Sequence, residues 1–341
     1  SLPVRKIRKE VLASLRGTCN MGCAHSTAVV VSVAETKDVQ QVAEAFELGS
    51  EWKLGSERKF HVEYVLREKL GNGSFGCVYS AVTVNEGSQA FAVKVADLRS
   101  EKQKGAIDTW KQKAMHNEVM SLMRLSGCKN VCGITENFLE KGLGYIVLER
   151  CDKTLYDTLA AAPALNEETL RKFFRGMLAG LAFVHSRGVV HRDVKPDNFV
   201  LQGHGPAAVV KLTDFGFARR LTPGEKLQQR AGTPTYMAPE IFHKEYDFKA
   251  DIWSLGITTL FLSTRRWPYR ARDSRRMMEK LMAGEVVSAE KQWKPQDPGL
   301  RQLVHAMLTV DPCERPGAQE ALAMLARLVA RRPAPPRRIS L

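Results

Sequence analysis

Two patterns of apolar and polar residues divide most of this chain. The first, between about residues 61 and 95, is typical of β-strands, because β-branched and aromatic residues come in short runs separated by glycine. His61–Leu66 is one such run, Gly71–Gly76 reads as a turn, Val78–Val82 is a second run and Phe91–Val95 is a third. We therefore expect a β-hairpin folded over a glycine-rich turn, followed by another strand.

The second pattern is helical and begins near Asn166. Apolar residues from Leu170 to Val184 recur at the spacing of one helix face, and Asn166 is a good N-cap for that helix. The same periodicity predicts further helices near residues 109–125, 250–263, 274–283, 299–308 and 317–330. Strands followed by helices indicate an α+β protein with a small β-rich lobe and a larger helical lobe.

The composition agrees with a two-lobed globular protein. Of the 341 residues, 44% are hydrophobic and 26% are charged, which is ordinary for a soluble domain of this size. No apolar run reaches the roughly 18 residues of a membrane span, so we expect no transmembrane helix. The seven cysteines show no paired spacing of a disulfide or zinc framework, and we therefore expect reduced thiols in a cytoplasmic protein.

The net charge of +14 is concentrated rather than spread. Residues 1–20, Arg265–Arg276 and residues 327–341 together carry the whole excess, and the rest of the chain is neutral. Such patches favour an acidic partner or an anionic membrane surface, although a solvated basic face is an equally simple reading. We expect an acidic partner at Arg265–Arg276, peripheral membrane association through the ends, and no nucleic acid partner.

The most specific segment is His191–Asn198, which is followed by Asp214, Phe215 and Gly216. Two carboxylates, a lysine and an asparagine at this spacing can hold a divalent metal beside a phosphate chain and take a proton from a hydroxyl. The segment resembles the catalytic loop of eukaryotic protein kinases, and the similarity extends from about residue 60 to 330. The resemblance implies the bilobal protein kinase fold, with an N-lobe at about 60–148 and a C-lobe at about 152–330.

The same resemblance implies roles for the ionisable residues. Asp193 would accept the proton of the substrate hydroxyl and Lys195 would neutralise the transferred phosphoryl group, while Asn198 and Asp214 would hold Mg²⁺ beside ATP. Lys195 after His-Arg-Asp-Val, and Thr233 before Pro-Thr-Tyr-Met-Ala-Pro-Glu, are typical of the serine/threonine class. By the same resemblance, Glu240 should form a buried ion pair with Arg315, and Asp251 should brace the catalytic loop. The motifs look nearest to the calcium/calmodulin-dependent group, and the expected partners are proteins with serine or threonine acceptors.

A glycine-rich loop precedes these residues in the chain. Gly71–Val78 has the form G-x-G-x-x-G-x-V, in which glycine lets backbone N–H groups approach phosphate oxygens. The same letters suit a dinucleotide fold, but there the loop leads into a helix, whereas strand-forming residues flank this one. The residues predicted to contact the nucleotide here are Gly71, Asn72, Gly73, Ser74, Phe75, Gly76 and Val78.

Lys94 ends a buried apolar strand and therefore needs a counter-charge. Glu118 lies on the same predicted helix face as Leu122 and is favoured over Glu101, which lies in a charged run without periodicity. By resemblance, Lys94 pairs with the α and β phosphates and is counted with the catalytic residues. The hinge is expected at residues 146–151, and the predicted contacts to the rest of the nucleotide are Ala92, Glu118, Leu148 as gatekeeper, Glu149 and Cys151.

Two departures from the family pattern concern regulation and substrate choice. In the family, the arginine at the position of Arg192 usually binds a phosphate on the activation loop. In this chain, however, Gln229 stands at the usual acceptor position four residues before Thr233. Thr222 is the only hydroxyl residue between Asp214 and Thr233, so we expect activity without phosphorylation at that position. Phe261 stands where kinases with a basic preference often carry an acid, which weakens the preference that Asp197 would support.

The ends of the chain suggest targeting. Met21–Ser26 has the form M-G-x-x-x-S of an N-myristoylation signal, with Cys23 placed for palmitoylation if Met21 is the true start. Residues 1–20 alternatively resemble a transit peptide or a membrane-surface helix. We expect an extension over residues 1–59, a kinase domain over residues 60–330, and a basic tail rich in proline and arginine over residues 331–341.

Two rival functions remain open from the sequence. A pseudokinase scaffold would be favoured by loss of Lys94, Asp193 or Asp214, and none of the three is lost. That scaffold would use the basic patches to bind acidic partners or membrane, whereas a nucleic-acid-binding or membrane-binding module on the arginine patches could coexist with a kinase.

Overall fold

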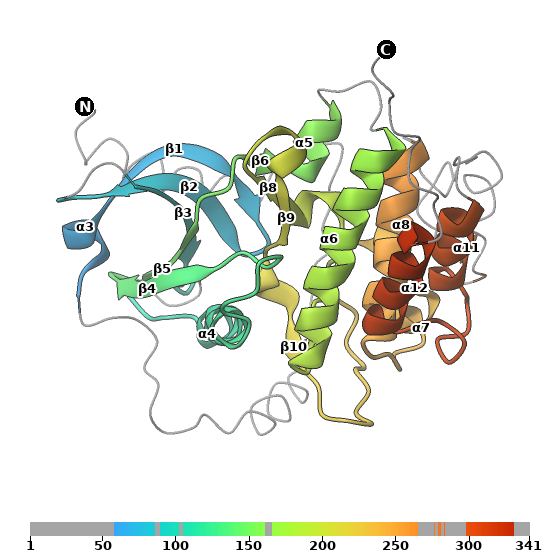
Figure 1. The fold of residues 1–341 in the computed structure, drawn as a ribbon. Coiled ribbons are helices and arrows are strands. Elements are labelled where there is room, and N and C mark those ends of the chain that lie inside the picture. The colour runs from blue at the N-terminus through green and yellow to red at the C-terminus, as the bar shows by residue number, and fades with distance from the viewer. Residues whose placement is uncertain are drawn as a thin grey trace, which may run out of the picture.

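A computed structural model describes residues 58–85, 89–101, 105–160, 166–264 and 298–330, together with positions 276, 279, 280 and 283. The chain forms a β-rich lobe and a helical lobe side by side, with short strands and turns between them (Figure 1). The predicted α+β, bilobal architecture is thus confirmed. Among the described residues, no helix is both long and apolar enough to span a bilayer.

The sheet of the β-rich lobe has five antiparallel strands in the order β1-β2-β3-β5-β4. Their bounds are β1 Tyr64–Gly73, β2 Gly76–Thr83, β3 Ala90–Asp97, β4 Ile134–Glu140 and β5 Leu143–Glu149. The predicted turn over Gly71–Gly76 is wrong in its extent. Gly73 pairs with Gly76, so that Ser74 and Phe75 alone form the turn. The ladder extends this far because paired strands satisfy backbone groups that an open turn would leave to water.

The predicted strand at His61–Leu66 is wrong over its first half. Phe60–Glu63 form a short helix, α3, and the strand begins at Tyr64. The cause is tertiary packing: the ring of Phe60 is fully buried and stacks on Tyr145 at a centroid distance of 4.1 Å. The imidazole of His61 lies 3.0 Å from a Glu140 carboxylate oxygen. Such contacts override the β propensity of the residues.

The helical lobe is built around two long helices. Asn166 caps α6, because its side-chain oxygen accepts a hydrogen bond of 2.8 Å from the Thr169 N–H, and the apolar face predicted from Leu170 to Val184 is buried. Helix α8 is buried over most of its length, with α11 packed against it and α12 packed against α6. The helix bounds are α4 Thr109–Arg124, α5 Leu155–Ala160, α6 Glu167–Ser186, α7 Pro239–Phe242, α8 Lys249–Thr264, α11 Pro298–Met307 and α12 Ala318–Ala330.

Short elements fill the junction of the lobes. A three-stranded sheet in the order β6-β8-β9 and a two-stranded sheet of β10 and β7 hold the loops between α6 and α8. The bounds are β6 Lys153–Thr154, β7 Val189–Val190, β8 Phe199–Gln202, β9 Val209–Leu212 and β10 Arg219–Arg220, with 3-10 turns at Pro196–Asn198, Gly205–Ala207, Phe215–Phe217 and Pro234–Tyr236. These elements set the positions of the residues singled out from the sequence.

Several predictions concern residues outside those that the structure describes. They are the extension over residues 1–57 with its acylation signal, almost all of Arg265–Arg276, most of the helix near 274–283, and the tail over residues 331–341. These stay predictions.

Candidate active site

One buried carboxylate fixes the backbone of the loop His191–Asn198. Asp251, on α8, accepts hydrogen bonds of 2.8 Å from the backbone N–H groups of both His191 and Arg192. The imidazole of His185 on α6 lies 2.9 Å from the same carboxylate. Burial alone would raise the pKa of Asp251, but the contacts with His185 and His191 together outweigh burial and lower it. Asp251 therefore remains ionised and fixes the loop backbone, as the resemblance implied.

Asp193 lies at the centre of a polar cluster. Its Oδ1 accepts hydrogen bonds from the Thr233 hydroxyl at 2.7 Å and the Thr233 N–H at 2.9 Å. Its Oδ2 lies 2.9 Å from the Lys195 ammonium and 3.0 Å from the Asn198 amide nitrogen. Lys195 also donates to the Thr233 hydroxyl at 2.8 Å. The structure thus brings the predicted base, lysine and asparagine together, and adds Thr233 as a link between the first two.

The backbone around this cluster is tightly packed. Arg192 has φ 68°, in the left-handed region that non-glycine residues rarely adopt. Gly232 has φ 104°, and a Cβ there would lie only 2.1 Å from the Arg192 carbonyl oxygen. Glycine is therefore required at position 232 for the activation segment to approach the catalytic loop.

The buried side chain of Lys94 makes two ion pairs, one with buried Glu118 and one with partly buried Asp214. Its ammonium lies 2.7 Å from one Glu118 carboxylate oxygen and 2.8 Å from Asp214 Oδ1. Lys94 is on β3 and Glu118 on α4, so the ion pair predicted from the helix periodicity is present, with Glu118 and not Glu101 as the partner. Glu101 instead lies 3.3 Å from Lys111.

The charges of Lys94 and Asp214 support each other, whereas burial and the charge of Asp214 raise the pKa of Glu118. Burial alone would lower the pKa of Lys94, but the carboxylates of Asp214 and Glu118 outweigh it and raise that pKa above its usual value. Burial alone would raise the pKa of Asp214, but Lys94 and hydrogen bonds from Ser74 lower it well below its usual range. A charged lysine and an ionised Asp214 are what a phosphate chain with a divalent metal requires.

The turn of the glycine loop reaches down to Asp214. The Ser74 hydroxyl and N–H donate to Asp214 Oδ2 at 2.7 and 3.0 Å. The ring of Phe75 packs against Phe217 and against Trp110 on α4, with centroid distances of 5.2 and 5.6 Å. The sequence placed Ser74 and Phe75 beside the nucleotide but gave no indication of these contacts.

Glycine is required at specific points of this loop. A Cβ at Gly76 would lie 2.2 Å from the Val95 carbonyl oxygen, and one at Gly73 would lie 3.0 Å from Lys94 Cε. Gly71 has open space around it, and Asn72 pairs with Cys77 across the hairpin. The loop therefore brings its backbone close to Lys94, where the phosphates would lie.

The expected hinge follows β5. Leu148 is buried and pairs with Ala92 on β3, while Val78 pairs with Lys94 across the sheet, so that Ala92, Leu148 and Val78 come from adjacent strands. Cys151 is buried. The Glu149 N–H donates to the Gly133 carbonyl at 3.0 Å and is therefore occupied.

The side chain of Glu149 makes contacts that the sequence did not indicate. Its Oε1 accepts from the Gly133 N–H at 2.6 Å and lies 2.9 Å from Lys211 on β9, and its Oε2 accepts from Gln202 at 3.1 Å. The carboxylate thus ties the hinge to the helical lobe.

The residues proposed for the metal carry donors that suit a divalent cation. The backbone next to Asp214 lies against Asn198, because the N–H of Thr213 donates to the Asn198 carbonyl at 2.9 Å. A carboxylate and an amide oxygen are hard donors, and Mg²⁺ in such sites takes its other ligands from substrate phosphates and water. Among the described residues, no group of three or more His, Cys, Asp or Glu forms an all-protein metal site. This donor set agrees with a metal that is bound together with a nucleotide.

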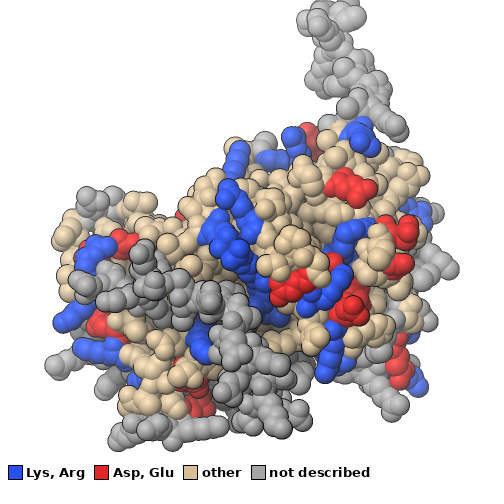
Figure 2. Space-filling model, turned by 90° about the horizontal axis from the view of Figure 1, so that it is seen from below, with Lys and Arg blue, Asp and Glu red and all other residues tan. Residues whose placement is uncertain are grey.

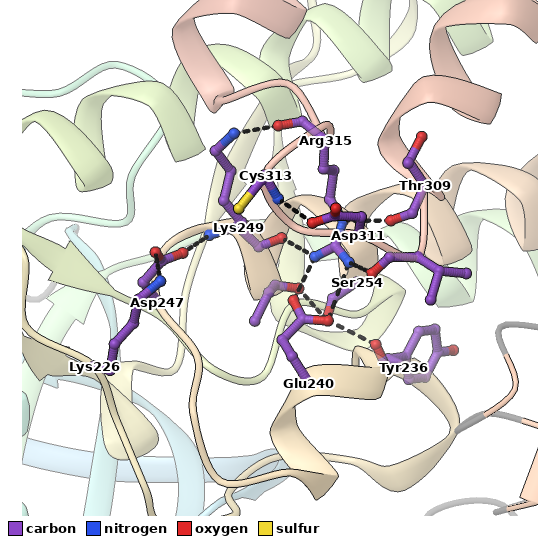
Figure 3. Close-up of polar contacts among 12 residues, drawn as sticks. Lys226, Tyr236, Glu240, Asp247, Lys249, Ser254, Thr309, Asp311, Cys313 and Arg315 are labelled. Atoms are coloured by element: carbon purple, nitrogen blue, oxygen red, sulfur yellow. Dashed lines mark hydrogen bonds and ion pairs between the residues drawn. The ribbon is translucent and has the colours of Figure 1, made fainter.

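A buried ion pair braces the end of the activation segment, as predicted. The Arg315 guanidinium lies 2.5 and 3.1 Å from the two Glu240 carboxylate oxygens, and it also donates to the carbonyls of Thr309 and Lys249 (Figure 3). The Arg315 side chain is fully buried and lies over the Trp253 ring at 5.1 Å.

Comparison with known proteins gives the class of this site. The protein kinase domain family matches residues 64–325. The chain is 29% identical to the liver/testis phosphorylase b kinase gamma catalytic chain of Bos taurus over 280 residues, which cover 80% of this chain and 68% of that one. It is 30% identical to CDPK-related kinase 8 of Arabidopsis thaliana over 289 residues, 84% of this chain and 47% of the relative.

A further relative is the calcium/calmodulin-dependent protein kinase type II of Caenorhabditis elegans, 30% identical over 271 residues that cover 79% of this chain and 36% of the relative. The chain thus spans about two thirds of the bovine relative and less than half of the other two. The chain belongs to the protein kinase family. It is a protein serine/threonine kinase that resembles the calcium/calmodulin-dependent group, and this membership implies ATP and a divalent metal.

Proposed function

We propose that this kinase transfers the γ-phosphoryl group of Mg²⁺-ATP to protein serine or threonine hydroxyls in signalling, and that it does so without phosphorylation of its activation segment. Two observations together support activity without phosphorylation. Gln229 stands at the usual acceptor position, and the buried side chain of Arg192 is already hydrogen-bonded to neutral groups. Arg192 Nε donates to the Phe217 carbonyl at 2.6 Å and Nη1 donates to the Tyr246 hydroxyl at 3.4 Å.

The chemistry assigned to the cluster follows from its geometry. Asp193, held by Thr233 and Asn198, has a carboxylate oxygen to accept the proton of the attacking hydroxyl. Lys195 beside it supplies positive charge where the phosphoryl group moves. Lys94 holds the phosphate chain, and Asp214 with Asn198 holds the metal, which screens the charge of the phosphates. The polar groups are fixed before substrate arrives, which is how such sites lower the barrier.

Thr222 is poorly placed to act as a regulatory acceptor. Its hydroxyl is exposed and donates to Glu225 at 2.8 Å, and a phosphate there would face that carboxylate. The pKa of Glu225 is lowered by the Thr222 N–H and hydroxyl, so the acid is ionised at neutral pH. Like charges at this distance disfavour a phosphate-ordered loop.

The acceptor peptide would meet a mixed surface. Asp197 is exposed near the catalytic loop, whereas Phe261 stacks on Tyr156 at a centroid distance of 6.5 Å with parallel rings. We propose that a single basic residue in the substrate is accepted but not required, because apolar Phe261 occupies the position at which kinases with a basic preference often carry an acid.

Basic side chains are not spread evenly over the described surface. In the view from below, Lys and Arg gather near the junction of the lobes, while acids and bases alternate over the helical lobe (Figure 2). We propose an acidic protein partner for the basic segment Arg265–Arg276. We also propose a cytoplasmic location with membrane association through Gly22 and Cys23. Membrane fractionation of a Gly22→Ala variant tests the last point.

The pseudokinase alternative predicts no phosphoryl transfer. Purified protein is incubated with Mg²⁺-ATP and a library of serine, threonine and tyrosine peptides, and the incorporated phosphate is counted for wild type and Asp214→Asn. We expect incorporation into serine and threonine peptides that Asp214→Asn reduces by at least two orders of magnitude. Equal incorporation in both proteins would contradict the catalytic assignment.

A further inference from the structure

One turn of the helical lobe holds the activation segment at several points. This turn, residues 245–249, leads into α8, whose first residue is Lys249, and is called the 245–249 turn below. Leu227 and Tyr246 form an antiparallel bridge, with N–H to carbonyl distances of 2.7 and 3.1 Å. The Tyr246 hydroxyl donates to the Gln229 carbonyl at 2.5 Å. The segment is thus fixed only a few residues before Thr233, which contacts Asp193.

The Tyr246 hydroxyl lies between two parts of the site. It accepts a hydrogen bond from Arg192 in the catalytic loop while it donates to the activation segment. Its side chain is 1% exposed, so neither bond competes strongly with water. A neutral hydroxyl therefore makes the connection between the catalytic loop and the segment that a phosphate makes in a loop-phosphorylated kinase.

The 245–249 turn is itself firmly anchored. The Lys226 ammonium lies 2.6 Å from Asp247 Oδ2, and Asp247 Oδ1 accepts from the Lys249 N–H at 2.8 Å (Figure 3). The Lys249 ammonium donates to the Arg315 carbonyl, and Arg315 is paired with Glu240. A continuous chain of contacts thus runs from the activation segment to the buried Arg315 brace.

No acid takes the place of a phosphate here. Among the described residues, no carboxylate lies within ion-pair distance of Arg192 or of its neighbour Arg219. Within the part of the chain that the structure describes, the Arg219 side chain donates to the adjacent Ala218 carbonyl at 3.2 Å and to no other group. Burial and the charge of Arg192 lower the pKa of Arg219 to about 10. The catalytic loop and the segment are therefore joined by a neutral contact and not by an ion pair.

We propose that Tyr246 is a positioning residue of this kinase, whose hydroxyl orders the activation segment in place of a loop phosphate. The proposal rests on the proposed function, since it explains how the unphosphorylated enzyme is active. Its effect reaches the chemistry through Gln229, Gly232 packed on Arg192, and Thr233 bonded to Asp193.

The test compares phosphatase-treated wild type with Tyr246→Phe, which keeps the ring and removes only the hydroxyl. We expect kcat to fall about five- to twentyfold, as for loss of one buried hydrogen-bonded group, while the KM for ATP changes less than about twofold. Trypsin should cut faster after Lys226 and Arg230, as mass spectrometry of the fragments would show. Tyr64→Phe, remote in the β-rich lobe, is the matched control and should leave both readouts unchanged.

A rescue separates positioning from simple packing. In the Tyr246→Phe background, Gln229→Glu adds a carboxylate to the residue whose carbonyl the Tyr246 hydroxyl binds. If that carboxylate pairs with Arg192, it should restore at least half of the lost kcat. Lys226→Met removes the half-exposed ion pair between Lys226 and Asp247 of the same turn, and should lower kcat about two- to threefold. If one of the two variants fails to fold, the other still tests the inference.

Three outcomes overturn the inference. A kcat for Tyr246→Phe within about twofold of wild type does so, and so does an equal kcat in the single and rescued variants. Unchanged trypsin cleavage also does so. If wild type itself is inactive after phosphatase and regains activity on phosphorylation, the proposed function fails instead. If wild type is active and Tyr246→Phe is equally active, only the role of Tyr246 fails.

Discussion

Replacing Thr233 by valine removes one hydroxyl from the centre of the site and leaves the side-chain volume nearly unchanged. That hydroxyl donates to Asp193 Oδ1 at 2.7 Å and accepts from Lys195 at 2.8 Å. Both partners are charged residues of the reaction. We therefore expect Thr233→Val to lower kcat more than it changes the KM for ATP.

The magnitude follows from what the substitution leaves in place. Asp193 keeps the Thr233 N–H at 2.9 Å, the Asn198 amide at 3.0 Å and the Lys195 ammonium at 2.9 Å. The substitution removes the hydroxyl's hydrogen bonds to both Asp193 and Lys195, but Lys195 keeps its ion pair with Asp193. The net loss is then close to that of one hydrogen bond to a charged group, about 1.5–3 kcal/mol. At 1.36 kcal/mol for each factor of ten in rate, kcat should fall roughly 10- to 150-fold.

The assay is steady-state phosphorylation of a serine peptide at saturating ATP, with Thr222→Val as the matched control. Thr222 is in the same segment, but its exposed hydroxyl contacts only Glu225, so the control should retain wild-type kcat. Thermal unfolding of each protein checks that the fold is intact. A Thr233→Val kcat within threefold of wild type would refute the idea that the hydroxyl links Lys195 to Asp193.

Three further substitutions test the charges. Lys94→Met leaves the carboxylates of Glu118 and Asp214 without a cation, so the pKa values of both should rise in the native state. The native state then binds more protons than the unfolded state. The Tm of the variant should therefore fall further below that of wild type at pH 7 than at pH 5. Arg315→Met strands the buried Glu240 carboxylate and should reduce the free energy of unfolding by about 3–5 kcal/mol in urea titration. Burial and the neighbouring charge of Arg192 disfavour the charged form of Arg219, so Arg219→Met should raise Tm by about 2–4 °C. A fall of Tm would show that Arg219 has an unrecognised anionic partner.

The sequence predicted the parts of the site that depend on fixed motif spacing or on helix periodicity. The Lys94–Glu118 pair is an example, because only Glu118 shares a helix face with buried leucines. The Glu240–Arg315 pair and the Asp251 brace were also expected, because the resemblance to protein kinases implies both, and the structure contains them.

Contacts between residues distant in sequence and without such a requirement were not predictable. Ser74 bonds to Asp214 across 140 positions, and a serine in a glycine turn has many ways to satisfy its hydroxyl. Tyr246 reads as an ordinary buried aromatic, and only the folded chain shows its hydroxyl between Arg192 and Gln229. The helix at Phe60–Glu63 was missed because aromatic stacking from β5 decides its conformation.

The central claim is that this serine/threonine kinase is active with an unphosphorylated activation segment. The most direct measurement is kcat for a serine peptide before and after exhaustive phosphatase treatment, with mass spectrometry to establish the phosphate content of residues 214–233. The account predicts the same kcat, within about twofold, when no phosphate remains in that segment. A loss of activity that returns only when Thr222 is phosphorylated would contradict it.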